Sequence, residues 1–151
     1  MLVLLVGCNH PEVPYIPSVP VINPEDPTVQ ITINGKLITQ SMSWYTAPDS
    51  SGFLVNFDKR DYPNATSIRF VANFETTDPI NYVHVRLFNL SQHVAVSGTE
   101  MRHNNLELYA ESSGNILNML PNAPVTLAIQ IKSELGVEVA TGWRSYLIIE
   151  E

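Results

Sequence analysis

The chain has 151 residues, of which 8 are Lys or Arg and 15 are Asp or Glu, so its formal net charge is −7. A chain of this length can form one domain that buries a core without metal ions or disulfides. The acidic balance opposes binding to phosphate backbones, so nucleic acid is excluded as a partner at this stage.

An apolar run over residues 1–7 ends in a small residue directly before the single cysteine, Cys8. The run is too short to span a bilayer. The segment Leu5-Val6-Gly7-Cys8 resembles the lipobox of bacterial lipoproteins. This resemblance implies that a diacylglycerol is attached to the thiol of Cys8, and that residues 1–8 are a signal-peptide remnant. No basic residue precedes Cys8, so we expect the natural start to lie upstream of Met1.

Prolines recur at positions 11, 14, 17, 20, 24 and 27. Because each proline fixes φ and removes an N–H, we expect residues 9–27 to form a polyproline II tether with a rise of about 3.1 Å per residue. The same prolines disfavour the alternative for residues 1–7, a buried first strand. The alternative for the tether itself is a ligand of a proline-recognition module, but the basic residues typical of such ligands are missing.

These two segments predict a cell-envelope protein that is anchored to a membrane through a lipid on Cys8. A diacylglyceryl group supplies the two acyl chains that stable attachment needs. By analogy with the lipoprotein family, Asn9 in place of an Asp permits export to the outer membrane of a Gram-negative host. A Gram-positive host would instead keep the protein on its one membrane.

From residue 28 onward apolar and polar residues alternate with a period of two, which predicts β-strands. We expect strands at residues 28–33, 36–39, 53–57, 67–74, 82–90, 93–96, 106–110, 125–132, 137–140 and 143–149. The pair Asn34-Gly35 predicts a type I′ turn, and therefore a hairpin between the first two strands. The turn at residues 133–136 predicts a second hairpin, between 125–132 and 137–140. Residues 116–120 are expected to form no more than one helical turn.

About eight to ten short strands without intervening helices predict an all-β domain over residues 28–151. We expect an antiparallel β-sandwich that is jelly-roll-like or immunoglobulin-like. Its expected core consists of the inward positions of the strands, namely Val29, Ile31, Ile33, Ile68, Phe70, Val83, Val85, Leu87, Val125, Leu127, Ile129, Ile131, Leu147 and Ile149.

Motifs for metal binding and catalysis are scarce. The histidines lack His-x-His and His-Glu-x-x-His spacings, and no Gly-x-Ser-x-Gly elbow or glycine-rich phosphate loop occurs. His84 shares a strand face with Arg86 and Phe88, so we expect it to face solvent or a partner. A loop that contains Asp58 and Asp61 is a calcium candidate, but the intervening basic residues favour a solvated turn. We therefore expect no enzyme activity, no cofactor and no metal.

The aromatic residues supply the functional lead. Trp44, Tyr45 and Tyr62 lie in or beside predicted loops and strand ends, and are the candidate ligand-binding residues, because exposed aromatic rings flanked by polar residues stack on sugar rings. The alternative is that tryptophans fill the core. We expect this for Trp143, whereas the sequence leaves it open for Trp44.

In architecture, residues 28–151 resemble the accessory β-sandwich modules of secreted and surface proteins, including carbohydrate-binding and adhesion modules. This resemblance implies a non-catalytic, lipid-anchored binding module that recognises a glycan or a protein partner. Two alternatives are a structural or assembly subunit of an envelope complex, docked through an edge strand and the tether, and a small hydrolase. The hydrolase would require a concave pocket with convergent carboxylates or a Ser-His pair.

Overall fold

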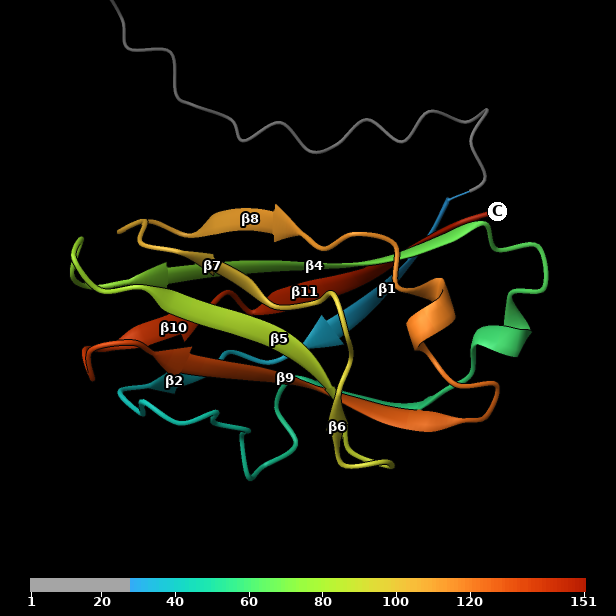
Figure 1. The fold of residues 1–151 in the computed structure, drawn as a ribbon, viewed down its shortest axis with the longest axis horizontal. Coiled ribbons are helices and arrows are strands. Elements are labelled where there is room, and N and C mark those ends of the chain that lie inside the picture. Colours follow the sequence, from blue (N-terminus) through green and yellow to red (C-terminus); the bar gives the residue numbers. More distant parts are fainter. Residues whose placement is uncertain (1–27) are drawn as a thin grey trace, which may run out of the picture.

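The computed structural model describes residues 28–151, so Cys8 and the expected tether over residues 9–27 lie outside the described part of the chain. Two antiparallel sheets pack face to face (Figure 1). The strands are β1 (Thr28–Asn34), β2 (Ile38–Thr39), β3 (Phe53–Phe57), β4 (Ser67–Thr76), β5 (Val83–Asn89), β6 (Val94–Ala95), β7 (Met101–His103), β8 (Tyr109–Ser112), β9 (Val125–Ser133), β10 (Val139–Thr141) and β11 (Arg144–Glu150). Within residues 28–151, no helix has the length and apolar character needed to cross a membrane.

The first sheet, called the β4 sheet, has four strands side by side when β1/β2 and β10/β11 are each counted as one interrupted strand. β11 pairs with the first half of β4 and β10 with its last residues, so β10 and β11 act as one interrupted strand. β1 and β2 follow the same line, because β1 pairs with β11 and β2 with β10. β8 pairs with the other edge of β4. The β4 sheet therefore runs from β1 and β2 through β11 and β10 to β4 and β8.

The second sheet, called the β5 sheet, has the order β3, β9, β5, with β6 and β7 both paired to the far edge of β5. With β1/β2, β6/β7 and β10/β11 each counted as one interrupted strand, each sheet has four. Every connection crosses from one sheet to the other except the one from β5 to β6. This is the topology of a jelly roll, so the predicted all-β antiparallel sandwich is confirmed, and it is of the jelly-roll kind.

The core lies between the sheets and comes from alternate residues of each strand. β4 and β5 show strict alternation of buried and partly exposed residues, as the period of two predicts. Twelve of the fourteen expected core residues are buried, and the other two, Val29 and Ile31, are partly buried and pack against the core. The alternation was therefore a sound guide to the core.

Both predicted hairpins are wrong. β1 pairs with β11, and only Gly35 of the Asn34-Gly35 pair has a positive φ, whereas a type I′ turn needs positive φ at both positions. After Gly35 the chain continues in the same direction, from its pairing with β11 to its pairing with β10. The N–H of Gly35 donates to the carbonyl of Trp143, which lies between those two strands, at 2.9 Å. The turn after β9 carries the chain into β10, which lies in the opposite sheet.

The structure also differs from the sequence prediction in smaller respects, and confirms one local element. The strand expected at residues 106–110 begins later, at Tyr109, and β7 was not predicted. Residues 117–119 form a 3-10 helix, η2 (Leu117–Met119), in agreement with the single helical turn expected there. Trp143 was expected in the core, but 73% of its surface is exposed, because it lies in the interruption between β10 and β11 where the alternation breaks.

Candidate functional site

The outer surface of the β5 sheet carries a group of charged and aromatic side chains in mutual contact. On β5 the side chains of Val83, Val85 and Leu87 enter the core, so His84 and Arg86 project outward. Lys132 lies on β9 directly beside His84 in the pairing register, and Arg102 lies on β7 on its other side. Lys132, His84 and Arg102 therefore form a row across the three strands β9, β5 and β7.

Trp44 joins this row through a short backbone contact. Tyr45 forms an antiparallel bridge with Ile131, in which the two residues exchange N–H to carbonyl hydrogen bonds of 2.9 and 3.1 Å. Because side chains alternate along an extended chain, Tyr45 packs against the core while Trp44 and Thr46 project outward. Gln130 confirms the register, since its amide donates to the hydroxyl of Thr46 at 2.9 Å.

Two cations contact the indole of Trp44. The guanidinium carbon of Arg86 lies 4.0 Å from the centre of the ring, and Nζ of Lys132 lies 4.6 Å from it. The electron-rich face of an indole attracts cations at these distances. The Nε–H of Arg86 also donates to Oε1 of Gln130 at 2.8 Å, which orients the guanidinium beside the ring.

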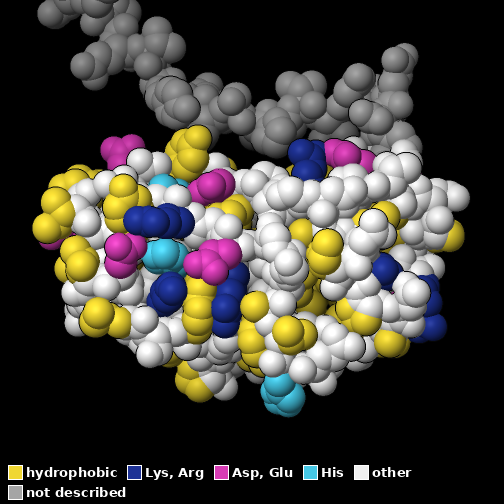
Figure 2. Space-filling model, viewed as in Figure 1, with side chains coloured by type: hydrophobic (Ala, Val, Ile, Leu, Met, Phe, Trp, Pro, Cys, Tyr) yellow, Lys and Arg dark blue, Asp and Glu magenta, His cyan; other side chains and the backbone are white. Residues whose placement is uncertain are grey.

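His84 connects this cluster to two carboxylates. Its Nδ1 lies 3.2 Å from a carboxylate oxygen of Glu100, and its Nε2 lies 3.0 Å from one of Glu134. Arg102 approaches the same Glu134 oxygen at 3.4 Å and lies 4.0 Å from the centre of the Tyr82 ring. We call these eight residues the cation–aromatic face: Trp44, Tyr82, His84, Arg86, Glu100, Arg102, Lys132 and Glu134. Figure 2 shows basic, acidic, histidine and hydrophobic side chains gathered together on this side of the molecule.

The pKa values on this face follow from the same contacts. The hydrogen bond from His84 holds the pKa of Glu134 below its usual value, and the positive charges of Arg102 and Lys132 add to this effect. Partial burial lowers the pKa of Arg86, although the nearby Glu100 carboxylate opposes the shift. A guanidinium stays protonated at any physiological pH. The guanidinium groups of Arg86 and Arg102 are therefore permanent positive charges on this face.

The three aromatic residues predicted to bind ligand do not come together. Only Trp44 reaches the cation–aromatic face. Tyr45 turns into the sandwich, and Tyr62 stacks on Phe57 with ring centres 6.2 Å apart, partly buried against the core. Both tyrosines thus have packing roles in this structure.

The calcium candidate also has a local structural role. Both carboxylate oxygens of Asp58 accept hydrogen bonds from the side chain of Arg60, and its Oδ1 also accepts from the Arg60 backbone N–H at 3.0 Å. Asp58 thereby caps the 3-10 helix η1 (Lys59–Asp61), and the hydrogen bonds and charge of Arg60 lower the Asp58 pKa. Within residues 28–151, no three His, Cys, Asp or Glu side chains gather as metal ligands would.

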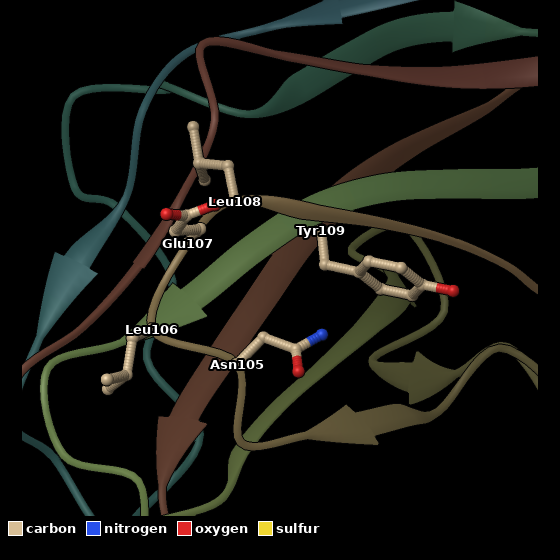
Figure 3. Close-up of a pocket in the computed structure, with 5 residues that line it drawn as sticks. All are labelled: Asn105, Leu106, Glu107, Leu108 and Tyr109. Carbon is tan, nitrogen blue, oxygen red and sulfur yellow. The ribbon is translucent and has the colours of Figure 1, made fainter. Parts of the chain in front are cut away.

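A separate open hollow of about 480 Å³ lies along the segment that joins β7 to β8. Its lining residues are consecutive, and their side chains point in different directions rather than toward a common centre (Figure 3). They are Asn105, Leu106, Glu107, Leu108 and Tyr109. This lining includes one carboxylate and no serine or histidine.

Sequence reasoning found part of the face. It placed His84 and Arg86 together on an outward strand face, but it did not connect them with Trp44, Glu100, Arg102, Lys132 or Glu134. The available signal was the set of polar residues at alternate positions of 125–132, which indicates an outward face that includes Gln130 and Lys132. Using that signal requires the pairing of β9 with β5, which no local pattern encodes.

Comparison with known proteins gives similarity of structure only. No protein family matches the chain, and no curated protein is similar to it in sequence. Solved structures with similarity include a chain of an IBDV viral particle, with a TM-score of 0.47 and 11% identity over 89% of this chain. Another is a chain of infectious bursal disease virus strain Gx, with a TM-score of 0.30 and 16% identity over 91% of this chain. This chain spans 35% of the length of each of those chains.

Proposed function

We propose that this protein is a non-catalytic glycan-binding module of the cell envelope, and that it holds its ligand on the cation–aromatic face. The observation that supports this most directly is the position of Trp44. A partly exposed indole lies on the outer side of the sheet, with Arg86 and Lys132 over its ring and hydrogen-bonding groups on the neighbouring strands. Aromatic surface combined with fixed polar groups is suited to a sugar ring, which has apolar C–H faces and hydroxyl edges.

The distribution of charge favours a glycan over a protein partner. Protein interfaces have an apolar centre from which charged residues are depleted, and place their charges at the rim. On the cation–aromatic face charged residues also occupy the centre, because His84, Arg86 and Lys132 lie on the central strands β5 and β9. A polar ligand such as an oligosaccharide matches a charged centre better.

The non-catalytic part of the proposal rests on the same residues. Hydrolysis of a glycoside typically needs two carboxyl groups that flank the bond to be cleaved. Glu100 and Glu134 are the carboxylates of the face, and both are already engaged by His84. The open hollow beside β8 supplies one carboxylate, that of Glu107.

A glycan array tests the proposal with three forms of the full chain. The wild type is expected to bind a defined set of glycans, and Trp44→Ala is expected to lose at least about tenfold in affinity, equivalent to about 1.4 kcal/mol. Trp143→Ala is the matched control, because that indole is 73% exposed and lies between β10 and β11, away from the face. Absence of binding by the wild type, or equal loss in both variants, would contradict the proposal.

The envelope location is a separate proposal that depends on Cys8. The Leu5-Val6-Gly7-Cys8 segment and the prolines that follow support a lipid anchor and a tether. Mass spectrometry of the natural protein, extracted from membranes, is expected to find a diacylglyceryl adduct on Cys8. Recovery of the protein from the cytosol with an unmodified thiol would refute the anchor and leave the glycan-binding proposal standing.

A further inference from the structure

We propose that the glycan is acidic, and that one of its sugar carboxylates binds to Arg86 and Lys132 beside the indole of Trp44. This inference rests on the proposed function and names the class of ligand. It predicts that the site recognises the charge of an acidic sugar, such as a uronic acid, in addition to the shape of the ring.

The first observation is that neither of these cations forms a salt bridge in the described residues, although carboxylates lie nearby. The salt bridges of the face use His84 and Arg102, which bind Glu100 and Glu134. Arg86 and Lys132 take part in none of the salt bridges found within residues 28–151. Two unpaired cations on one face are notable in a chain whose net charge is −7.

The second observation is that their hydrogen-bonding capacity is largely unused. Arg86 donates through Nε to Gln130, whereas its two Nη groups have no acceptor among residues 28–151. The ammonium of Lys132 likewise has no acceptor in that part of the chain. Gln130 fixes the guanidinium from one side only, and the remaining donors can form the paired hydrogen bonds that a carboxylate accepts.

The third observation is that the sheet holds both cations close together. In the register of β5 and β9, Arg86 is opposite Gln130 and Lys132 is opposite His84, so the two basic residues are diagonal neighbours on one face. Both charged groups lie within 4.6 Å of the centre of the Trp44 ring. Like charges held this close repel each other, and an anion bound to both relieves the repulsion.

The surrounding carboxylates explain why one acid group is expected rather than a dense polyanion. The carboxylates of Glu100 and Glu134 border the two cations, and the hydrogen bond with His84 lowers the pKa of Glu134. A second anionic group placed over them would be repelled. The face thus suits a carboxylate at one position, with neutral sugar rings on either side.

The test compares an acidic glycan with the same glycan after its charge is masked. The probes are otherwise neutral oligosaccharides that carry one galacturonic acid or one sialic acid, each beside its methyl ester, measured by calorimetry with the full chain. The free acid is expected to bind at least about tenfold more tightly than the ester, and the difference is expected to shrink as salt is added.

Two variants locate the effect. Lys132→Gln and Arg86→Gln are each expected to remove most of the preference for the acid, whereas Arg144→Gln, a loss of charge on β11 of the other sheet, is expected to keep it. Thermal unfolding of each variant verifies the fold, and Lys132→Gln alone decides the matter if Arg86→Gln unfolds. Equal binding of acid and ester would overturn this inference but leave glycan binding intact. Absence of binding to any glycan would overturn both.

Discussion

The guanidinium carbon of Arg86 lies 4.0 Å from the centre of the Trp44 ring, although β3 and β4 separate the two residues along the chain. Gln130 holds the guanidinium from one side, and the Tyr45–Ile131 bridge fixes the backbone beside the indole. The contact thus joins three separate segments on the surface of one sheet. The contact forms only when these segments are correctly packed, so a measurement of its strength tests both the site and the fold.

We predict that this contact contributes measurably to stability. A double-mutant cycle with Trp44→Ala and Arg86→Ala is expected to give a coupling energy of about 0.5–1 kcal/mol, the usual strength of an exposed cation–π pair. Urea unfolding of the four proteins measures it. The control cycle pairs Trp44→Ala with Arg144→Ala, on β11 of the other sheet, and should be additive within about 0.5 kcal/mol. Additivity in both cycles would show that the contact is energetically neutral.

The sequence was sufficient to predict the fold class, most of the strands and most of the core. The reason is that each strand has its own local pattern, and β4 and β5 alternate without interruption. The strand pairing was not predictable in the same way. In a jelly roll nearly every connection crosses between the sheets, so a turn signal such as Asn34-Gly35 indicates a change of direction but not the partner strand.

The candidate site was predictable only in fragments for the same reason. Local alternation shows that His84 and Arg86 face outward together. It cannot show that Lys132 is opposite His84, or that Tyr45 bridges Ile131, because these are long-range pairings. The burial prediction for Trp143 was wrong. It was assigned to the core from its apolar neighbours, but the interruption between β10 and β11 exposes it.

We predict that loss of Phe70 severely destabilises the domain. Phe70 is fully buried on β4, where it is opposite Leu147 of β11 and hydrogen-bonds to Ser113 on its other side. Phe70→Ala is expected to lower the free energy of unfolding by about 3–5 kcal/mol, because it removes buried apolar surface and leaves a cavity. Val55→Ala on the edge strand β3 is the control, since Val55 is 61% exposed and should cost less than about 0.5 kcal/mol. Urea unfolding compares the two, and similar costs would mean that the sheets are not packed as described.

Gly35 and Gly98 make a matched pair for testing the turn geometry. Both have positive φ, at 129° and 79°. A Cβ on Gly35 would lie 2.5 Å from the backbone nitrogen of Gly52, whereas a Cβ on Gly98 would have nothing within 4 Å. Gly98→Ala is therefore expected to lower the free energy of unfolding only through its strained backbone conformation, by about 1–2 kcal/mol. Gly35→Ala must also displace a neighbouring backbone, and it is expected to cost clearly more in thermal unfolding. An equal or smaller cost at Gly35 would contradict the close approach of the two segments.

His103 provides the last prediction, a pH dependence of stability. Its ring stacks on Phe74 with centres 4.0 Å apart, and its Nδ1 accepts a hydrogen bond from the backbone N–H of Asn105 at 3.2 Å. Burial lowers the pKa of His103 from its ordinary value of 6.5. As the pH falls below about 6.5, the unfolded chain binds a proton that the folded chain resists, so the free energy of unfolding decreases.

The variant His103→Phe keeps the ring stack with Phe74 and removes the titrating group. Urea unfolding at about pH 7.5 and about pH 5.5 is expected to show a smaller loss of stability at low pH in His103→Phe than in the wild type. His93→Asn is the control, because His93 is exposed and its positive φ of 54° suits asparagine. That control should retain the pH dependence of the wild type. If His103→Phe retains it as well, the loss of stability arises from other groups, and the partly buried ring of His103 does not resist protonation.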